Sequence, residues 1–252
     1  MRNKFAEVIY KTGLKDNRIC ALVADISPAG AMIKFREKFP KRFINCGVAE
    51  QAMIGIAAGL ALRGMRPFCY TIATFTLYRP FEMVRVDLCY QNLPVTIVGM
   101  GTGTIYSTLG GTHLTQEDIS VARSIPNMNI IAPCDPNELE EAVKYCCTKS
   151  KGPVYLRIGK AGEKNFTNKL SEKWQFGKIR KVHPGKNICI LTFGPIIEKA
   201  FEIKEQLNKK KILPEIYSCH TLKPFDYLGL KKIFKKFKTI VIIEDHSKIG
   251  GL

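Results

Sequence analysis

Apolar residues in the first 160 positions gather in short runs that alternate with longer segments of helical periodicity. The runs at 19–26, 43–48, 66–71, 94–98, 129–132 and 153–158 are rich in β-branched residues and predict strands. Segments 49–62, 81–90 and 138–147, between those runs, predict helices. Because the runs are nearly continuous, we expect strands buried on both faces of a mainly parallel sheet, which is an α/β fold.

A polar stretch separates this pattern from a second, shorter one. Residues 161–180 carry charged and amide side chains with little periodicity and predict a linker between a first domain, 1–160, and a second, 181–252. In the second domain, predicted strands 187–193, 213–217 and 239–244 alternate with predicted helices 195–208 and 228–237. The smaller domain is therefore also predicted to be α/β.

Composition supports a folded protein outside the membrane. Of the 252 residues, 46% are hydrophobic, which is enough for a sizeable core. No apolar run approaches the roughly 18 residues of a membrane span, and the N-terminus lacks a signal-like apolar segment. The nine cysteines form no Cys-x-x-Cys pair, so we expect reduced, buried thiols rather than a zinc or redox site. The expected localisation is cytoplasmic, without membrane contact.

The net charge of +17 is concentrated in the second half of the chain. Residues 151–252 hold 22 Lys and Arg against 9 Asp and Glu. Many of these lysines fall at predicted helix ends or faces, where a solvated surface is the ordinary interpretation. Nucleic-acid binding is not expected, because no reading motif or interleaved aromatic pattern accompanies the charge. A basic surface would also steer anionic substrates or an acidic partner subunit.

Five positions carry candidate chemistry, although each has a simpler structural explanation. Glu50 begins the predicted helix 49–62, where acids are common because the free backbone N–H groups favour negative charge. Phe75 and Tyr78 are spaced by three, as in ordinary core packing, and His113 lies in a glycine-rich loop. Asp25 ends the first predicted strand, where a carboxylate often caps a turn.

The order of several short motifs changes this assessment. The motifs are Gly47-Val48-Ala49-Glu50-Gln51, Thr74-Phe75, Gly111-Thr112-His113 and Ser124-Ile125-Pro126-Asn127, followed by Thr192-Phe193-Gly194-Pro195 and the segment 244–252. Together they resemble the pyrimidine-binding and C-terminal domains of the transketolase and deoxyxylulose-phosphate synthase family. The resemblance implies a parallel-sheet domain that binds the pyrimidine of thiamine diphosphate, followed by a smaller, truncated or abbreviated α/β transketolase C-terminal domain.

The resemblance also implies roles for the five positions. Glu50 would hydrogen-bond N1′ of the cofactor's aminopyrimidine and favour the imino tautomer that removes the C2 proton of the thiazolium. Phe75 and Tyr78 would line the pyrimidine ring, and His113 would contact the substrate and shuttle protons. Asp25 would lie near the cofactor or the subunit interface. The stretch after Phe75 is shorter than in transketolase, which leaves the role of Phe81 unassigned.

Nothing in the chain resembles the family's N-terminal domain, whose Gly-Asp-Gly signature and downstream Asn hold magnesium and the diphosphate. The resemblance therefore implies that thiamine diphosphate is shared with a separate diphosphate-binding subunit, which would hold Mg²⁺, while this chain supplies no metal ligand. A homodimer or an α2β2 heterotetramer is expected. Small residues at Gly55, Ala58, Gly59 and Ala61 are expected to form one close-approach face of the Glu50 helix at such an interface.

The function that these observations favour is that of a C-terminal transketolase subunit, a transferase that moves a two-carbon ketol unit between sugar phosphates or related carbohydrates. Three alternatives remain: the β subunit of a 2-oxo acid dehydrogenase decarboxylase, a deoxyxylulose-phosphate synthase-like protein, and a non-catalytic scaffold of the same fold. Gly111-Thr112-His113 resembles transketolase more than the decarboxylases. The absent N-terminal half disfavours the synthase, and the combined retention of Glu50, His113 and the aromatics disfavours a scaffold.

Overall fold

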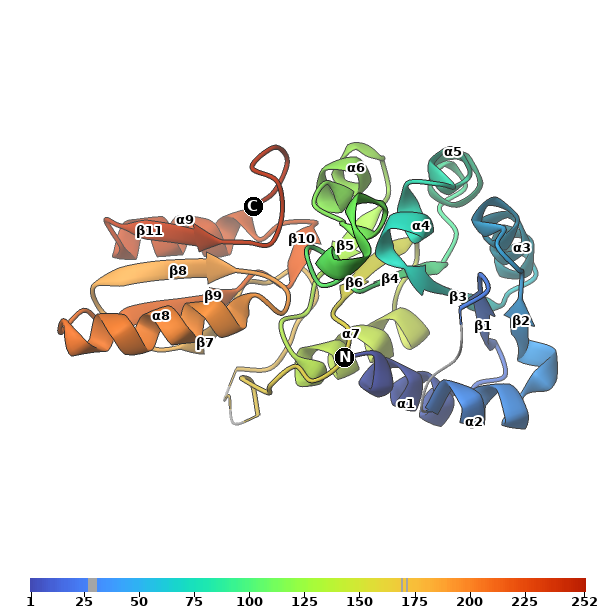
Figure 1. The fold of residues 1–252 in the computed structure, drawn as a ribbon, viewed down its shortest axis with the longest axis horizontal. Coiled ribbons are helices and arrows are strands. Elements are labelled where there is room, and N and C mark those ends of the chain that lie inside the picture. Colours follow the sequence, from blue (N-terminus) through green and yellow to red (C-terminus); the bar gives the residue numbers. More distant parts are fainter. Residues whose placement is uncertain (27–30, 169, 171) are drawn as a thin grey trace.

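The computed structural model describes residues 1–26, 31–168, 170 and 172–252, and it contains two α/β units side by side (Figure 1). The larger unit is built on one seven-stranded sheet and the smaller on a four-stranded sheet. Helices of the larger unit are α1 (Arg2–Gly13), α2 (Ala31–Lys38), α3 (Glu50–Leu62), α4 (Ala73–Leu77), α5 (Phe81–Met83), α6 (Asp118–Ser124) and α7 (Pro136–Thr148). Shorter helical turns are η1 (Pro40–Arg42), η3 (Ser107–Leu109) and η4 (Gly111–His113), and a π-helical segment, η2 (Val84–Tyr90), continues α5.

The large sheet has the strand order β10-β5-β6-β4-β3-β1-β2. Its strands are β1 (Ile19–Val23), β2 (Phe43–Asn45), β3 (Arg66–Ile72), β4 (Thr96–Met100), β5 (Asn129–Ile131), β6 (Val154–Ile158) and β10 (Thr221–Lys223). All neighbours pair in parallel except β10, which runs antiparallel to β5. Every strand expected from the first 160 residues is present, whereas β10 was not predicted.

Both faces of the large sheet are covered, which explains the nearly continuous apolar runs. In β1, Ile19, Ala21 and Val23 pack in one core with α1 and α7, while Cys20 and Leu22 pack in the other with α3. Successive side chains of a strand point to opposite faces, so a strand between two helical layers must be apolar at every position. All nine cysteines are free thiols and eight of them are buried, as the sequence predicts.

The smaller sheet has the order β11-β8-β9-β7 and lies between two amphipathic helices (Figure 1). Its elements are β7 (Arg180–His183), β8 (Ile188–Thr192), α8 (Ile197–Lys209), β9 (Pro214–Ser218), α9 (Tyr227–Lys236) and β11 (Ile240–Ile243). Strand β7 pairs antiparallel with β9 and starts at the last residue of the predicted linker; residues 169 and 171 of that linker lie outside the described residues.

The junction of the two units contains a buried ion pair. Arg157 of β6 donates from Nε to Asp118 Oδ2 over 2.9 Å, and from Nη2 to the carbonyl of Asp245, which follows β11, over 2.9 Å. The Tyr155 hydroxyl donates to the same Asp118 oxygen over 2.7 Å. The segment after β11 is thereby tied to the large sheet. Among the helices that the structure describes, none has both the length and the apolar character of a membrane crossing.

Candidate active site

Four of the five candidate positions follow the carboxyl ends of four adjacent parallel strands. Asp25 follows β1, Glu50 follows β2, Phe75 follows β3, and His113 follows β4. These strands are neighbours in the order β4-β3-β1-β2. Ligands of open α/β sheets bind beyond the carboxyl ends of the strands, so the topology directs all four positions to the edge where a site is expected.

Glu50 is the first residue of α3 and its side chain is buried, with only 2% of its surface exposed. The preceding residue, Ala49, provides no side-chain cap, so the negative carboxylate lies beside helix N–H groups that no side chain satisfies. A buried carboxylate requires a partner, because an unpaired charge away from water is costly.

Arg79 is that partner, and the sequence did not reveal it. Its Nη1 donates to Glu50 Oε2 over 2.8 Å, and its guanidinium carbon lies 4.5 Å from the centre of the Phe75 ring. The guanidinium therefore makes an ion pair and a cation–π contact at once. A cation within the aromatic segment 75–81 was the available signal, but only the fold shows that it reaches a residue 29 positions earlier.

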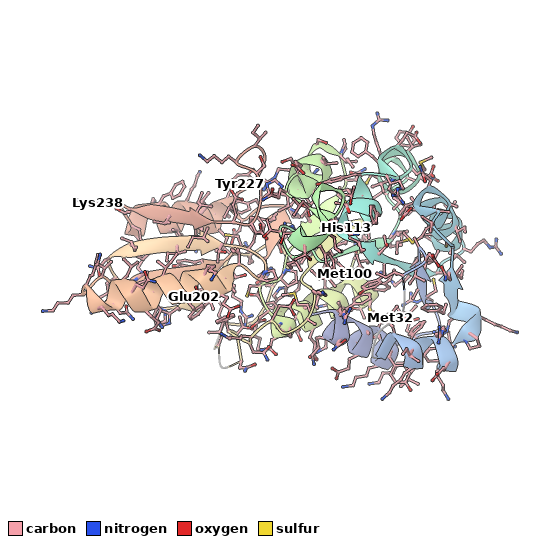
Figure 2. All side chains as sticks on the ribbon, in the orientation of Figure 1. Met32, Met100, His113, Glu202, Tyr227 and Lys238 are labelled. Carbon is pink, nitrogen blue, oxygen red and sulfur yellow. The ribbon has the colours of Figure 1, made fainter. Side chains whose placement is uncertain are left out.

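His113 completes a continuous line of contacts from Glu50. Its ring meets Phe75 edge to face at 5.3 Å and Tyr106 at 6.2 Å, and its Nδ1 lies 2.9 Å from the Thr112 hydroxyl oxygen. Figure 2 shows His113 in the central part of the molecule, in the larger unit. The structure thus brings Glu50, Phe75 and His113 together through Arg79, and it adds Tyr106, which sequence reasoning had not singled out.

Tyr78 and Asp25 are placed less directly. The Tyr78 hydroxyl lies 3.2 Å from both Glu117 Oε2 and the Glu117 backbone nitrogen, and burial raises the pKa of Tyr78, with the Asp118 charge adding to the shift. Asp25 is exposed, in a left-handed conformation with φ of 45°, and its N–H donates to Asn45 Oδ1 over 3.1 Å. In the described part of the chain, no hydrogen bond or ion pair joins Asp25 to Glu50 or His113.

The predicted small-residue face of α3 divides into two faces. Ala58 and Ala61 are buried against the sheet, whereas Gly55 and Gly59 are exposed. The expectation of a single face was therefore wrong, because at about 100° per residue Gly59 and Ala61 lie about 160° apart around the helix axis. The exposed side of α3 is nevertheless apolar, since Ile56 is 40% exposed there.

The arrangement fits the aminopyrimidine end of thiamine diphosphate. It offers a buried carboxylate as a hydrogen-bond acceptor, with an aromatic wall and an imidazole beside it. No group of three or more His, Cys, Asp or Glu side chains with the spacing of a metal site occurs among the described residues.

Comparison with known proteins identifies both units. The family model of the transketolase pyrimidine-binding domain matches residues 1–162, and that of the transketolase C-terminal domain matches residues 177–252. The chain is 32% identical to a subunit of the apulose-4-phosphate transketolase of Phocaeicola vulgatus, covering all of this chain and 80% of the relative. It is 33% identical to the 6-deoxy-6-sulfo-D-fructose transketolase subunit SqwH of a Clostridium species, covering all of this chain and 78% of that protein.

Solved structures agree with these matches. A split-gene transketolase, described as an inactive β4 tetramer, superimposes with a TM-score of 0.89 at 31% identity, covering all of this chain and 81% of that one. A transketolase of Pichia stipitis in complex with sedoheptulose 7-phosphate has a TM-score of 0.85 at 21% identity over 39% of its length, which supports the fold alone. The chain therefore belongs to the transketolase family and carries that family's pyrimidine-binding and C-terminal domains.

Proposed function

We propose that this chain is the subunit of a transketolase-like enzyme that binds the pyrimidine of thiamine diphosphate, while a separate subunit holds the diphosphate and Mg²⁺. The reaction is the transfer of a two-carbon ketol unit between sugar substrates. The observation that carries the proposal is the buried Glu50 carboxylate, paired with Arg79 beside Phe75 and His113 at the carboxyl edge of the sheet. The two relatives named as transketolase subunits support the dependence on a partner.

Each residue of this edge has a defined task in the proposal. Arg79 bonds Oε2 of Glu50, which leaves Oε1 to hold a proton shared with N1′ of the aminopyrimidine. When bound, thiamine diphosphate supplies the carbanion chemistry of ketol transfer. Phe75 and Tyr78 exclude water from the pyrimidine side, and His113 donates or accepts a proton at a substrate oxygen. Asp25 is assigned to the rim of the same edge.

The exposed face of α3 is the proposed contact with another subunit. Val48 is 72% exposed and Leu62 is 62% exposed at the two ends of this helix, with Ile56, Gly55 and Gly59 between them. Large apolar side chains on one helix face are typical of a subunit interface. Glu50 starts the same helix, so assembly there would bring the second subunit next to the cofactor carboxylate.

The proposed substrates are ketoses that carry an anionic group. One named relative acts on apulose 4-phosphate and another on a sulfonated fructose, and this chain has a net charge of +17. A positive surface raises the local concentration of anionic substrates and their association rates. A 1-deoxy-D-xylulose-5-phosphate synthase of Clostridium perfringens is also 33% identical over 98% of this chain, which makes up 40% of that protein. The assay should therefore compare a ketose phosphate with pyruvate as donor.

The decisive experiment reconstitutes the chain with its diphosphate-binding partner, thiamine diphosphate and Mg²⁺, and measures ketol transfer to an aldose acceptor. We expect Glu50→Gln to lower kcat by about 10²-fold or more, because an amide can hydrogen-bond but cannot exchange the proton. Glu82→Gln is the matched control, since Glu82 is an exposed glutamate of α5. Full activity of Glu50→Gln in a correctly assembled complex would show that the proposed role of Glu50 is wrong.

A further inference from the structure

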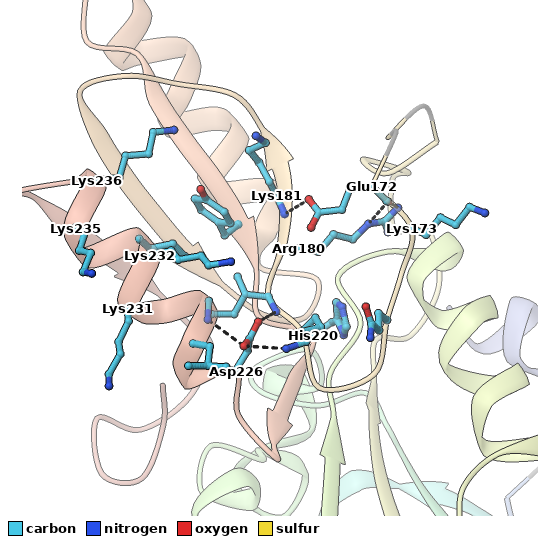
Figure 3. Close-up of a pocket in the computed structure, with 17 residues that line it drawn as sticks. Glu172, Lys173, Arg180, Lys181, His220, Asp226, Lys231, Lys232, Lys235 and Lys236 are labelled. Atoms are coloured by element: carbon cyan, nitrogen blue, oxygen red, sulfur yellow. Dashed lines mark hydrogen bonds and ion pairs between the residues drawn. The ribbon is translucent and has the colours of Figure 1, made fainter.

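A cavity of about 880 Å³ lies in the smaller unit, between helix α9 and the segment 172–181 that leads into β7. Figure 1 places this unit at the opposite end of the molecule from α3, so the cavity is separate from the Glu50 edge. Its size falls within the roughly 300–1,000 Å³ of typical small-molecule sites. Figure 3 shows Lys231, Lys232, Lys235 and Lys236 along one wall.

The cavity is lined predominantly by cations. Eight of its side chains are Lys or Arg, and only two, Glu172 and Asp226, are acidic. The cationic members are Lys173, Lys178, Arg180, Lys181, Lys231, Lys232, Lys235 and Lys236. Charges of one sign around a hollow reinforce one another and attract ions of opposite charge.

The two acids do not neutralise these cations. Asp226 caps α9 by accepting the N–H of Gly229 over 3.0 Å and that of Ile179 over 3.2 Å, and its ion pair with Lys178 is long, at 3.4 Å. Glu172 accepts the backbone N–H of Lys181 over 3.1 Å rather than a lysine ammonium. The carboxylates therefore hold the backbone in place and leave most of the ammonium groups available.

Some of the cations are already committed, which identifies the free ones. Lys236 bonds both oxygens of Glu215 at 2.7 Å, and Arg180 donates to the Glu172 carbonyl and to Glu138. Among the described residues, the side chains of Lys231 and Lys232 on α9 have no ion-pair partner. Both are exposed at the mouth of the cavity.

A buried histidine adds a directional hydrogen-bonding group at the inner wall. His220 is fully buried, and its Nδ1 lies 3.0 Å from the Thr221 hydroxyl oxygen, which accepts the N–H of Gly177 over 3.2 Å. The Thr221 hydroxyl can donate to Nδ1 or accept from it, and when it donates, the imidazole proton lies on Nε2. Nε2 has no hydrogen-bond partner among the described residues, and a buried polar atom without a partner is costly unless a ligand satisfies it.

We propose that this cavity binds a small polyanion that carries two or more linked phosphate groups. Ammonium groups bind phosphate oxygens as point charges, and several of them around one hollow match a polyphosphate better than a single phosphate. In the tautomer that carries its proton on Nε2, His220 at the inner wall donates to one of the phosphate oxygens. Tyr217, Ile179, Leu228 and Ile233 also line the cavity and provide room for an uncharged part of the ligand.

The protein contains its own reporter for this site. Trp174 is the single tryptophan of the chain, and its ring stacks on His220 at 4.9 Å. Inorganic triphosphate, ATP and orthophosphate are titrated into the full chain, with Trp174 fluorescence and calorimetry as readouts, at about 0.05 M and about 0.3 M salt. We expect saturable triphosphate binding that weakens with salt and is at least about tenfold tighter than orthophosphate binding. Tighter binding of ATP than of triphosphate would show that the uncharged part contributes.

Paired charge reversals test the location. Lys231→Glu with Lys232→Glu should weaken triphosphate binding by at least about tenfold, or about 1.4 kcal/mol. Lys209→Glu with Lys210→Glu reverses two exposed charges at the end of α8, outside the cavity. This control pair should change the affinity for triphosphate by less than about twofold. Equal losses in both variants, or no saturable binding in the parent chain, would overturn the proposal. Tighter binding of a thymidine oligonucleotide, insensitive to the first pair, would also overturn it.

Discussion

The buried pair between Asp118 and Arg157, in the larger unit at its junction with the smaller one, allows a quantitative test of how much a buried charge pair contributes to stability. We consider Asp118→Asn, which removes the negative charge while preserving the size of the side chain. Asp118 is fully buried and Arg157 is 2% exposed. In the variant, the Arg157 guanidinium keeps its hydrogen bonds to the carbonyl oxygens of Asp245, at 2.9 Å, and Thr115, at 3.4 Å. It loses the negative charge that balances its own.

Removing one partner of a buried ion pair costs about 3–5 kcal/mol, because the remaining charge stays away from water. For a chain of this size, each kcal/mol lowers the melting temperature by about 2–4 °C, so we expect a decrease of about 6–20 °C. Asp16→Asn is the matched control. Asp16 also pairs with an arginine, Arg18, over 2.7 Å, but that arginine is 55% exposed. Exposed pairs contribute about 0–1 kcal/mol, so the control should lose at most about 4 °C.

The assay is thermal unfolding followed by circular dichroism, together with urea unfolding at fixed temperature. A double variant, Asp118→Leu with Arg157→Met, separates charge from packing, since removing both partners leaves no unpaired buried charge and should cost less than Asp118→Asn. If Asp118→Asn destabilises the protein no more than Asp16→Asn, the argument from burial is refuted.

Three further predictions concern other parts of the fold. Burial lowers the pKa of His220 from its ordinary 6.5, so below that pH the unfolded chain binds a proton more readily than the folded chain does. We expect the stability to fall as the pH drops below about 6.5, and urea titrations of His220→Gln should show a shallower dependence of stability on pH. Asp135 accepts four hydrogen bonds, one as the N-cap of α7 and three from residues 166 and 167. Asp135→Ala should therefore lower the free energy of unfolding, measured in urea, by at least about 3 kcal/mol. A decrease of only about 1 kcal/mol, which is the contribution of an N-cap alone, would contradict this. Gly101 and Gly110 both have positive φ, at 72° and 78°, but of the two only Gly101 would place a Cβ atom against a ring, that of Tyr106. Gly101→Ala should therefore be less stable than Gly110→Ala by about 1–3 kcal/mol. Equal losses of stability in the two variants would exclude the steric explanation.

Much of the fold could be predicted because periodicity is a local property. The apolar runs identified the parallel strands of the large sheet, and the amphipathic segments identified α3, α7, α8 and α9. The missed elements include the twelve-residue helix α1 and two strands of the sheets. Strand β10 has three residues and is held by pairing with β5, and β7 is an antiparallel strand whose side chains are buried and exposed in turn. Helix 81–90 was predicted, but its wider π-helical turns were not.

The structure brings part of the candidate set together, and the roles of these residues stay a prediction. Glu50, Phe75 and His113 were chosen from motifs, and the structure places all three in one line of contacts. Arg79 was missed, because a single exposed arginine has no pattern that indicates a distant partner. Asp25 remains a prediction, since its contacts in the structure are with the turn after β2.

The sequence by itself determined the order of strands and helices, the α/β class and the residues at the carboxyl ends of the strands. These properties depend on residues a few positions apart, whose spacing sets which side chains share a face. Only the tertiary structure decided that Arg79 neutralises Glu50, that Asp118 pairs with Arg157, and that lysines of α9 face the segment 172–181 across a cavity. Such contacts join residues tens of positions apart, and they follow from the packing of complete elements, which no local pattern encodes.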